Sequence, residues 1–253
     1  MMSLLRYVLL AALLLSLNGC VYLRLLELKN QFAEFDKYFR VEAGEHFVVR
    51  FLHPVLYLDD FSELAKIEPT RVENLPVGRR SVQVYRKLDR NGAPQPGVDI
   101  VFTLDFNKDD KLTSWDFSPT FLAMAPSPFL EASIRSLGKS KVDEGKKQIQ
   151  VMESDLPKVT APPPKREAIV KLLGEPHEIR KDKDHMVAVY RYQMLTPHVE
   201  DGFADRKDCK IQFFYDEKTG DIVKMSGKFA GLKISINFRK LRDAVQVPME
   251  NAG

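Results

Sequence analysis

Two stretches of the chain place an apolar residue at every second position, and this alternation constrains the fold more than any other feature. One covers 98–106, and the other covers 232–238, where Lys233, Ser235 and Asn237 stand between the apolar residues. Successive side chains of a β-strand point to opposite faces, so each stretch would form a strand with one apolar face. Such strands are typical of an antiparallel sheet that packs helices on one face and meets water on the other.

Helical periodicity predicts the elements that would cover the apolar face. Residues 22–40 carry Leu25, Leu28, Phe32 and Phe35 at intervals of three and four, which is one apolar stripe of an amphipathic helix. Shorter helices and further strands follow from the same patterns and from turn residues. The helices are expected at 61–67, 129–137 and 166–173, and the strands at 46–52, 81–88, 112–117, 148–152, 186–194, 209–216 and 222–229.

The two halves of the chain show a similar order of elements. The Val-Tyr pair at 84–85 and the hairpin 101–117 correspond to the Val-Tyr pair at 189–190 and the segment 211–229. A match across about 100 residues indicates a duplication or a pseudo-symmetric fold. Each half would contain a helix, a strand, a second helix and then an antiparallel meander.

This repetition predicts an α+β fold of two similar helix-strand-helix-antiparallel-meander units, with each sheet packed by helices on one face. The first unit would span residues 20–125 and the second residues 126–253. The length of the chain fits one large or two small domains, so it is compatible with both units.

The first twenty residues have the composition of a targeting segment. Arg6 supplies a positive charge, 7–17 is an apolar run that contains one serine, and Asn18-Gly19 follows. This order of charged, apolar and small-residue segments predicts a secretory signal peptide, which would cover residues 1–19. The alternative is an uncleaved membrane helix, which needs roughly 20 apolar residues and matches this shorter run less well.

The end of this segment, Leu-Asn-Gly-Cys20, resembles the lipobox of bacterial lipoproteins. The resemblance implies cleavage before Cys20 and attachment of acyl chains to it, which hold a protein firmly in a membrane. In that family an Asp after the cysteine favours the inner membrane of enteric bacteria, and this chain has Val21. We therefore expect a lipid anchor in the outer membrane, with the protein facing the periplasm. Cys209 would then lack a disulfide partner and is expected to be buried in a strand.

Residues 165–230 resemble the small outer-membrane assembly lipoproteins of the SmpA/BamE kind. The resemblance rests on a helix ending in Leu-Gly-Glu-Pro176, a Tyr-containing strand at 189–192 and a hairpin that begins at 211–216. The family pattern, a helix before a three-stranded antiparallel sheet, implies a partner-binding adaptor rather than an enzyme. We accordingly expect a non-enzymatic binding or scaffolding lipoprotein of the cell envelope, active in outer-membrane assembly or maintenance, with an envelope protein as its partner.

Composition and charge give no sign of a nucleic-acid partner. The chain has 38 Lys and Arg against 35 Asp and Glu, which is a formal net charge of +3. Domains that bind nucleic acid usually gather basic residues on one face in larger excess, so no nucleic acid is expected as a partner.

One acidic segment resembles a calcium site and is better explained as a turn. Asp105, Asn107 and Asp109 resemble the start of an EF-hand loop, with Asp116 at the twelfth position, but Asp110 stands where that loop requires glycine. Strand residues surround the segment, and a charged hairpin turn explains it better.

The sequence carries no strong signal of catalysis. His177, His185 and His198 lie near acidic residues without the close spacing of a zinc site, so no metal and no cofactor are expected. No nucleophile elbow, phosphate-binding loop or dinucleotide-binding fingerprint is present. Catalytic triads can assemble from distant segments, which keeps a lipid-anchored periplasmic hydrolase as the alternative function.

Aromatic strands in the second half predict a partner-binding surface. Strand geometry sends Tyr190 and Tyr192 to one face and Arg191 to the other, while aromatic residues occupy both faces of 211–215, with Phe214 alone on its side. Exposed Tyr, Phe and Arg are typical anchors of protein interfaces. Tyr190, Arg191, Tyr192 and Phe214 are therefore the predicted partner-binding residues, and the alternative is that all four belong to the core.

Overall fold

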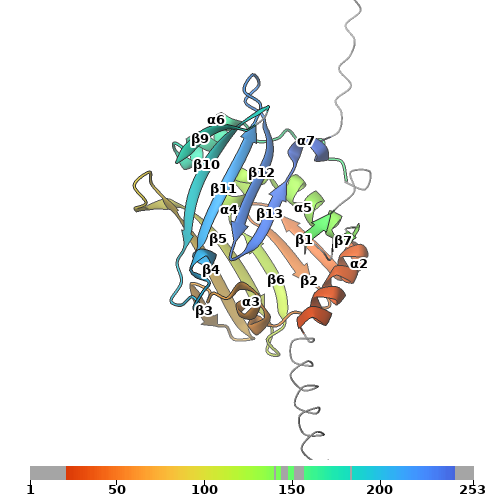
Figure 1. Cartoon of the computed structure of the whole chain (residues 1–253). Helices are drawn as coiled ribbons and strands as arrows, with labels where there is room; N and C mark the ends of the chain where they lie inside the picture. Colours follow the sequence, from red (N-terminus) through yellow and green to blue (C-terminus); the bar gives the residue numbers. More distant parts are fainter. Residues whose placement is uncertain (1–20, 140, 144–147, 151–156, 183, 243–253) are drawn as a thin grey trace, which may run out of the picture.

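The computed structural model describes residues 21–139, 141–143, 148–150, 157–182 and 184–242, and most of its strands belong to one antiparallel sheet (Figure 1). Nine strands follow one another across this sheet: β1 (Phe39–Ala43), β2 (Phe47–Phe51), β6 (Leu112–Phe117), β5 (Pro94–Phe106), β4 (Arg79–Leu88), β10 (His185–Met194), β11 (Asp208–Tyr215), β12 (Ile222–Phe229) and β13 (Leu232–Ile236). Two shorter strands pair with β4 and β10, namely β3 (Arg71–Asn74) and β9 (Glu178–Asp182). A separate hairpin joins β7 (Lys141–Asp143) to β8 (Gln148–Gln150).

The prediction of two units, each with its own helix-covered sheet, is wrong, because β4 and β10 pair with each other and join the halves into one sheet. The register places Tyr192 opposite Lys87 and Met194 opposite Tyr85. β3 pairs with β4 only up to residue 82, and β9 pairs with β10 only up to residue 189. Beyond these points the backbone N–H and C=O groups on that edge of β4 and β10 would be costly to leave without hydrogen bonds. The two strands provide these hydrogen bonds by pairing with each other.

The strands on the two sides of the β4–β10 pair follow the same order. In the first half α3 (Leu58–Ala65) precedes β3, the long strand β4 and the meander β5–β6. In the second half α6 (Arg166–Leu173) precedes β9, β10 and the meander β11–β12. The first half adds β1 and β2 beside β6, and the second half adds β13 beside β12. The halves are thus two walls of a single sheet rather than separate bodies.

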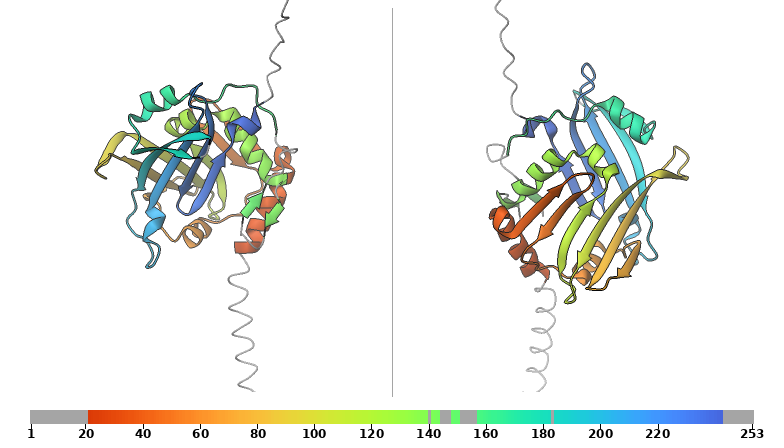
Figure 2. Two further views of the ribbon diagram at one scale, coloured as in Figure 1. Left: turned by 45° about the horizontal axis from the view of Figure 1, so that its top comes forward. Right: turned by 180° about the vertical axis from the view of Figure 1, so that it is seen from behind.

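The sheet is curled, and helices fill its concave side (Figure 2). α4 (Pro119–Met124) and α5 (Ser127–Ser136) lie between the two walls, and α7 (Phe238–Leu241) packs beside β12. The ring centre of Phe102 on β5 lies 5.2 Å from that of Phe121 on α4 and 5.3 Å from that of Phe229 on β12. Side chains of both walls and of the enclosed helix therefore share one hydrophobic core.

An N-terminal helix borders the first wall. Residues 21–33 are helical and α2 (Phe35–Tyr38) follows, so the helix predicted over 22–40 is confirmed up to the point where β1 begins. Leu25, Leu28 and Phe32 pack against the core, as their spacing predicts.

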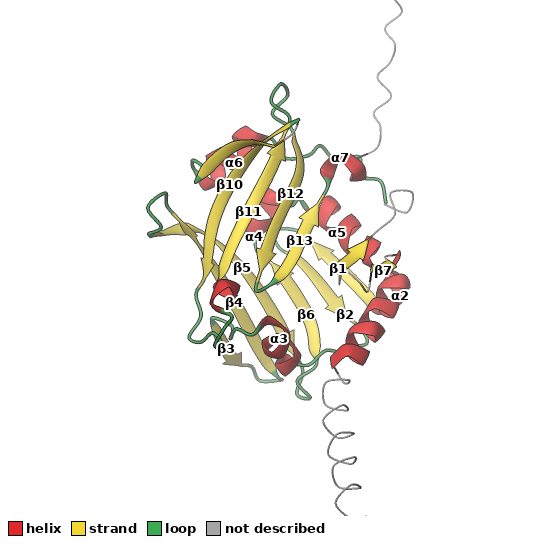
Figure 3. Cartoon of the chain, viewed as in Figure 1, coloured by secondary structure: helices red, strands yellow, loops and turns green. Residues whose placement is uncertain are grey.

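Two short 3₁₀ turns, η1 (Leu137–Lys139) and η3 (Ala204–Lys207), complete the helical elements shown in Figure 3. Within the described ranges, no helix combines the length and the apolar composition needed to cross a membrane. Cys20 and the predicted signal segment 1–19 lie outside the described residues.

Candidate functional site on the convex face

The convex face of the sheet carries rows of polar and charged side chains that are arranged by strand register. Residues that pair directly in an antiparallel sheet point to the same face, with their Cβ atoms about 5 Å apart. The rows therefore follow from the pairing and can be compared between the two halves.

Four cations form one row across the second half. Arg191 of β10 pairs with Lys210 of β11, and Lys228 of β12 pairs with Lys233 of β13. The register between β11 and β12 brings Lys210 and Lys228 next to each other as well. The three lysines are exposed and Arg191 is half-buried. We call these four residues the cation row.

Within the described residues, only one member of the cation row has an acidic partner. Nζ of Lys228 lies 3.0 Å from Oδ2 of Asp205, and this hydrogen bond lowers the pKa of the Asp205 carboxyl. Like charges directly opposite each other destabilise a sheet, so the fold keeps this row at a cost in stability. Arrangements that oppose local stability are most often found at functional sites, which makes the cation row the candidate site.

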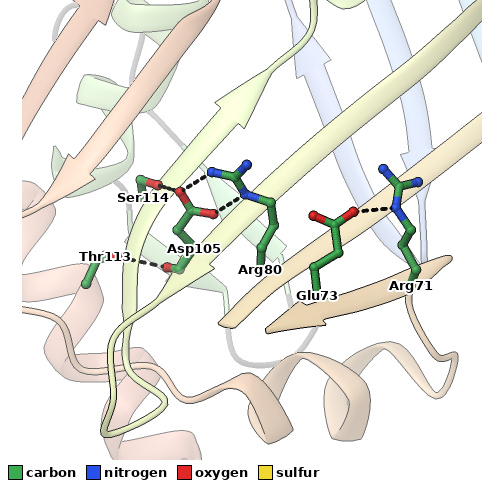
Figure 4. Close-up of polar contacts among 6 residues, drawn as sticks. All are labelled: Arg71, Glu73, Arg80, Asp105, Thr113 and Ser114. Atoms are coloured by element: carbon green, nitrogen blue, oxygen red, sulfur yellow. Dashed lines mark hydrogen bonds and ion pairs between the residues drawn. The ribbon is translucent and has the colours of Figure 1, made fainter. Parts of the chain in front are cut away.

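The first half carries a row in which the charges alternate (Figure 4). Ser114 of β6, Asp105 of β5, Arg80 of β4 and Glu73 of β3 pair in sequence across the sheet. Arg80 donates to both carboxylate oxygens of Asp105, from Nε at 2.7 Å and from Nη2 at 3.0 Å. Oγ of Ser114 lies 3.3 Å from the same carboxylate, and Glu73 accepts a hydrogen bond from Arg71 at 2.6 Å. The Asp105 carboxylate raises the pKa of the Arg80 guanidinium.

Other charges on this side of the first half are paired in the same way. The distances are 2.8 Å between Arg86 and Asp99, 2.9 Å between Arg50 Nη2 and Glu42 Oε2, and 2.8 Å between His46 Nδ1 and Asp116. Most of the charges named on the convex face of the first half therefore lie next to an opposite charge, although Arg40 of β1 pairs directly with Arg50 of β2. In the second half, Arg191, Lys210 and Lys233 have no acidic partner among the described residues, and Lys228 has one.

The structure divides the four predicted partner-binding residues into two pairs. Tyr190 and Tyr192 point to the concave side and are 0% and 1% exposed, so they belong to the core. The Tyr190 hydroxyl donates to the backbone oxygen of Gly174 at 3.0 Å, and burial raises the pKa of both phenols. Arg191 and Phe214 are half-buried on the convex face, where Arg191 belongs to the cation row.

Phe214 lies on the same face as the cation row, toward the other end of β11. It pairs with Lys224 of β12, whose Nζ is 5.1 Å from the centre of the Phe214 ring. Burial of part of the ring beneath an ammonium group is a favourable arrangement for an aromatic residue at a surface. Phe214 thus adds a half-buried aromatic side chain to this face, where it also pairs with the buried Val187 of β10.

Three members of the cation row are not among the predicted site residues. Lys210, Lys228 and Lys233 each occupy an outward position of a strand, which the alternating pattern indicates. Their alignment depends on the register of three consecutive strands, which the two connecting turns set and the sequence pattern does not reveal. Basic residues at outward positions of successive strands of one meander are the signal that could have found them.

Neither of two pockets in the described part of the chain brings a serine or cysteine next to a histidine. One, of about 180 Å³, includes Lys87, Glu175 and His177 in its lining. Lys87 is buried there and donates to the backbone oxygen of Leu173, at the C-terminal end of α6, and to Gln95 at 3.0 Å. It therefore caps a helix, and its burial lowers its pKa.

The second pocket, of about 290 Å³, lies where α6 meets the β11–β12 turn and includes Arg166, Tyr215 and Thr219 in its lining. Among the described residues, no three or more His, Cys, Asp or Glu side chains lie together so that they could hold a metal ion.

Two smaller predictions are confirmed. The segment that resembles an EF-hand forms the turn between β5 and β6, where Oδ1 of Asn107 accepts from the backbone nitrogens of Asp109 and Lys111, both at 3.0 Å. Asp105 bonds to Arg80 instead of the loop. Cys209 lies in β11, is 1% exposed, and has a pKa raised by burial.

Comparison with known proteins gives no match: neither the family models, nor the curated proteins, nor the solved structures contain one for this chain. The function must therefore be inferred from the chain's own surface and from the motifs of its sequence.

Proposed function

We propose that the protein is a lipid-anchored binding or scaffolding module of the cell envelope, without enzymatic activity, at the periplasmic side of the outer membrane. The cation row carries this proposal, because it is an exposed charged surface that its own neighbours leave largely uncompensated. The motif Leu-Asn-Gly-Cys20 supports the lipid anchor. The similarity of residues 165–230 to lipoproteins of the SmpA/BamE kind supports a role in outer-membrane assembly or maintenance.

The partner that best fits the cation row is an envelope protein with an acidic surface. The row crosses four adjacent strands, so it is about 15 Å long at the usual strand spacing of about 5 Å. Such a line of charges favours encounter with a surface of opposite charge and disfavours wrong partners. Phe214, on the same face, supplies an aromatic side chain of the type that anchors interfaces.

Lipidation is tested by metabolic labelling with a fatty-acid analogue. We expect label on the wild type and none on Cys20→Ser, because the Cys20 thiol would carry the acyl chains. In the lipoprotein family an Asp after the cysteine favours the inner membrane, so labelled Val21→Asp should move from the outer-membrane to the inner-membrane fraction. Undiminished labelling of Cys20→Ser would refute the anchor.

Partner binding is tested by crosslinking in intact cells, followed by purification from solubilised membranes. The double variant Lys210→Glu/Lys233→Glu should lose most of the crosslinked protein, because it reverses the sign of half the cation row. The matched control Arg40→Glu/Arg90→Glu reverses two exposed arginines of the first half and should keep it. Equal recovery in both variants, with unchanged circular dichroism, would show that the cation row is not the binding surface.

A further inference from the structure

The described fold begins with a helix that packs on the core, and no linker separates this helix from residue 20. Val21 is 7% exposed, and Leu25 and Leu28 in the following turns pack against the hydrophobic core. An anchor at residue 20 would therefore hold the folded body close to the membrane. In Figure 1 the helix begins at the lower end of the molecule, where α3, β3 and the β5–β6 turn also lie.

Side-chain contacts join the start of this helix to α3 and to the β5–β6 turn. Arg24 donates from Nε to Oδ2 of Asp60 in α3 at 2.8 Å, and its guanidinium lies 5.0 Å from the ring centre of Tyr57. Nζ of Lys111, which follows the turn, lies 5.5 Å from the same ring. The first turn of the helix and these two elements thus form one continuous surface.

The turn between β3 and β4 belongs to the same surface. Gly78 has a positive φ of 95° and packs so tightly that a Cβ atom there would stand 1.9 Å from the backbone oxygen of Phe106. Arg79 donates to Asp110 of the β5–β6 turn at 2.6 Å. Val77, which precedes Gly78, is therefore held at the same end of the molecule as Tyr22 and Leu23.

Three side chains at this end are unusually exposed for their type. Val77 is 72% exposed, Leu23 is 65% exposed and Tyr22 is 58% exposed. The exposed or half-buried charges around them have both signs and include Lys108, Lys111, Asp59 and Asp109. Exposed apolar side chains that gather at one end, with Tyr among them, suit the boundary between lipid and water better than they suit water.

We propose that this end rests on the membrane, with Tyr22, Leu23 and Val77 at the lipid interface. The inference rests on the proposed anchor at Cys20, because a tether without intervening chain keeps a weakly lipophilic surface at high effective concentration beside the lipid. Burial of the three side chains then favours contact, and the mixed charges around them make it nearly independent of salt. In Figure 1 the strands β10–β13 lie above this end of the molecule, so contact of this end with lipid would leave the wall that carries the cation row away from the membrane.

The test places an environment-sensitive fluorophore on Val77→Cys in the full-length, acylated protein, reconstituted in vesicles of phosphatidylethanolamine and phosphatidylglycerol. Cys209 is buried and Cys20 would be acylated, so neither competes for the label. The matched control is Ile179→Cys in β9, which is 45% exposed and lies toward the opposite end of the molecule. We expect blue-shifted emission and quenching by lipid-borne quenchers at residue 77, water-like emission at residue 179, and no change at high salt.

Flotation of the same vesicles separates this inference from the proposed anchor. Protein that fails to float with the vesicles overturns the anchor, and with it the contact. Protein that floats while the probe at residue 77 stays as water-exposed as the probe at residue 179 overturns the contact alone. A Leu23→Asp substitution in the labelled protein should move the emission of the residue-77 probe toward that of water, and an unchanged spectrum would count against the contact.

Discussion

The two walls of the sheet use similar strand layouts and opposite charge patterns on their convex faces. In the alternating row of the first wall Asp105 lies between Ser114 and Arg80, so opposite charges or neutral groups meet across these strands, although Arg40 faces Arg50 elsewhere in the same wall. In the second wall Arg191 meets Lys210, and Lys228 meets Lys233. The first pattern stabilises the sheet that carries it, and the second opposes like charges and leaves positive charge exposed. The two walls have similar strand layouts, so the difference between their surfaces comes from which charged residues the strand register places opposite each other.

The largest expected effect comes from the core that the two walls share. Phe102→Ala should lower the free energy of unfolding by about 3–5 kcal/mol, because Phe102 packs against the enclosed helix and against β12 of the other wall. Urea denaturation followed by Trp115 fluorescence and by circular dichroism should show one transition by both probes. Two separate transitions would mean that the walls fold independently. Leu232→Ala, at a side chain 57% exposed, is the control and should change little.

A smaller loss is expected when the alternating row is broken. Asp105→Ala removes the partner of Arg80 and should lower the free energy of unfolding by about 0.5–1 kcal/mol. The value is modest because the side chains are 40% and 27% exposed, so water screens the pair. Urea denaturation at low salt measures the loss, which should shrink at high salt. Asp109→Ala, at an exposed position of the β5–β6 turn, is the control.

A charge substitution in the second wall should change stability in the opposite direction and make the protein more stable. Lys210→Glu would place a carboxylate between Arg191 and Lys228 and should raise the free energy of unfolding by a few tenths of a kcal/mol. If the cation row is the proposed binding surface, the variant would bind an acidic partner less well and yet be slightly more stable. Thermal denaturation beside the crosslinking assay measures both quantities. A destabilised Lys210→Glu would show that the cation row is not under the strain inferred for it.

The smallest effect is a pH dependence of one pair in the first wall. The hydrogen bond from Arg50 holds the pKa of the Glu42 carboxyl below its ordinary value. A carboxyl with a lowered folded pKa adds stability above its unfolded pKa, and this contribution is lost as the pH falls through the folded pKa. An NMR titration of Glu42 should show the low pKa, and Arg50→Gln should raise it. The same pKa in both proteins would mean that the pair does not persist in solution.

Local features of the fold follow from the sequence, while its long-range pairing does not. The alternation in 98–106 predicts the part of β5 that packs on the core, the stripe in 22–40 predicts the N-terminal helix, and Cys209 lies buried in a strand as expected. The pairing of β4 with β10 joins segments about a hundred residues apart, and no period in the sequence encodes it.

The candidate site, too, is predictable from the sequence in its local features and not in its long-range ones. The opposite orientations of Arg191 and its two tyrosine neighbours are readable from strand geometry. Whether each side is covered depends on the curl of the sheet, which buries Tyr190 and Tyr192 among the enclosed helices. The four cations line up only because three strand pairs have the observed register. A shift of one residue in any of these pairs would move side chains to the opposite face and break the alignment.

The sheet curls without closing, and within the described part of the chain β1 and β13 are the edge strands at the two ends of its nine-strand path; β3 and β9, which pair with one strand each, lie beside that path. An exposed edge can recruit the edge of another molecule, and the proposed lipid anchor would bring copies of this protein together. Both edge strands are five residues long and present charged side chains, Arg40 and Glu42 on one and Lys233 on the other. Short, charged edge strands disfavour edge-to-edge pairing, so copies of this protein at high local concentration are expected not to grow into fibrils through β1 and β13.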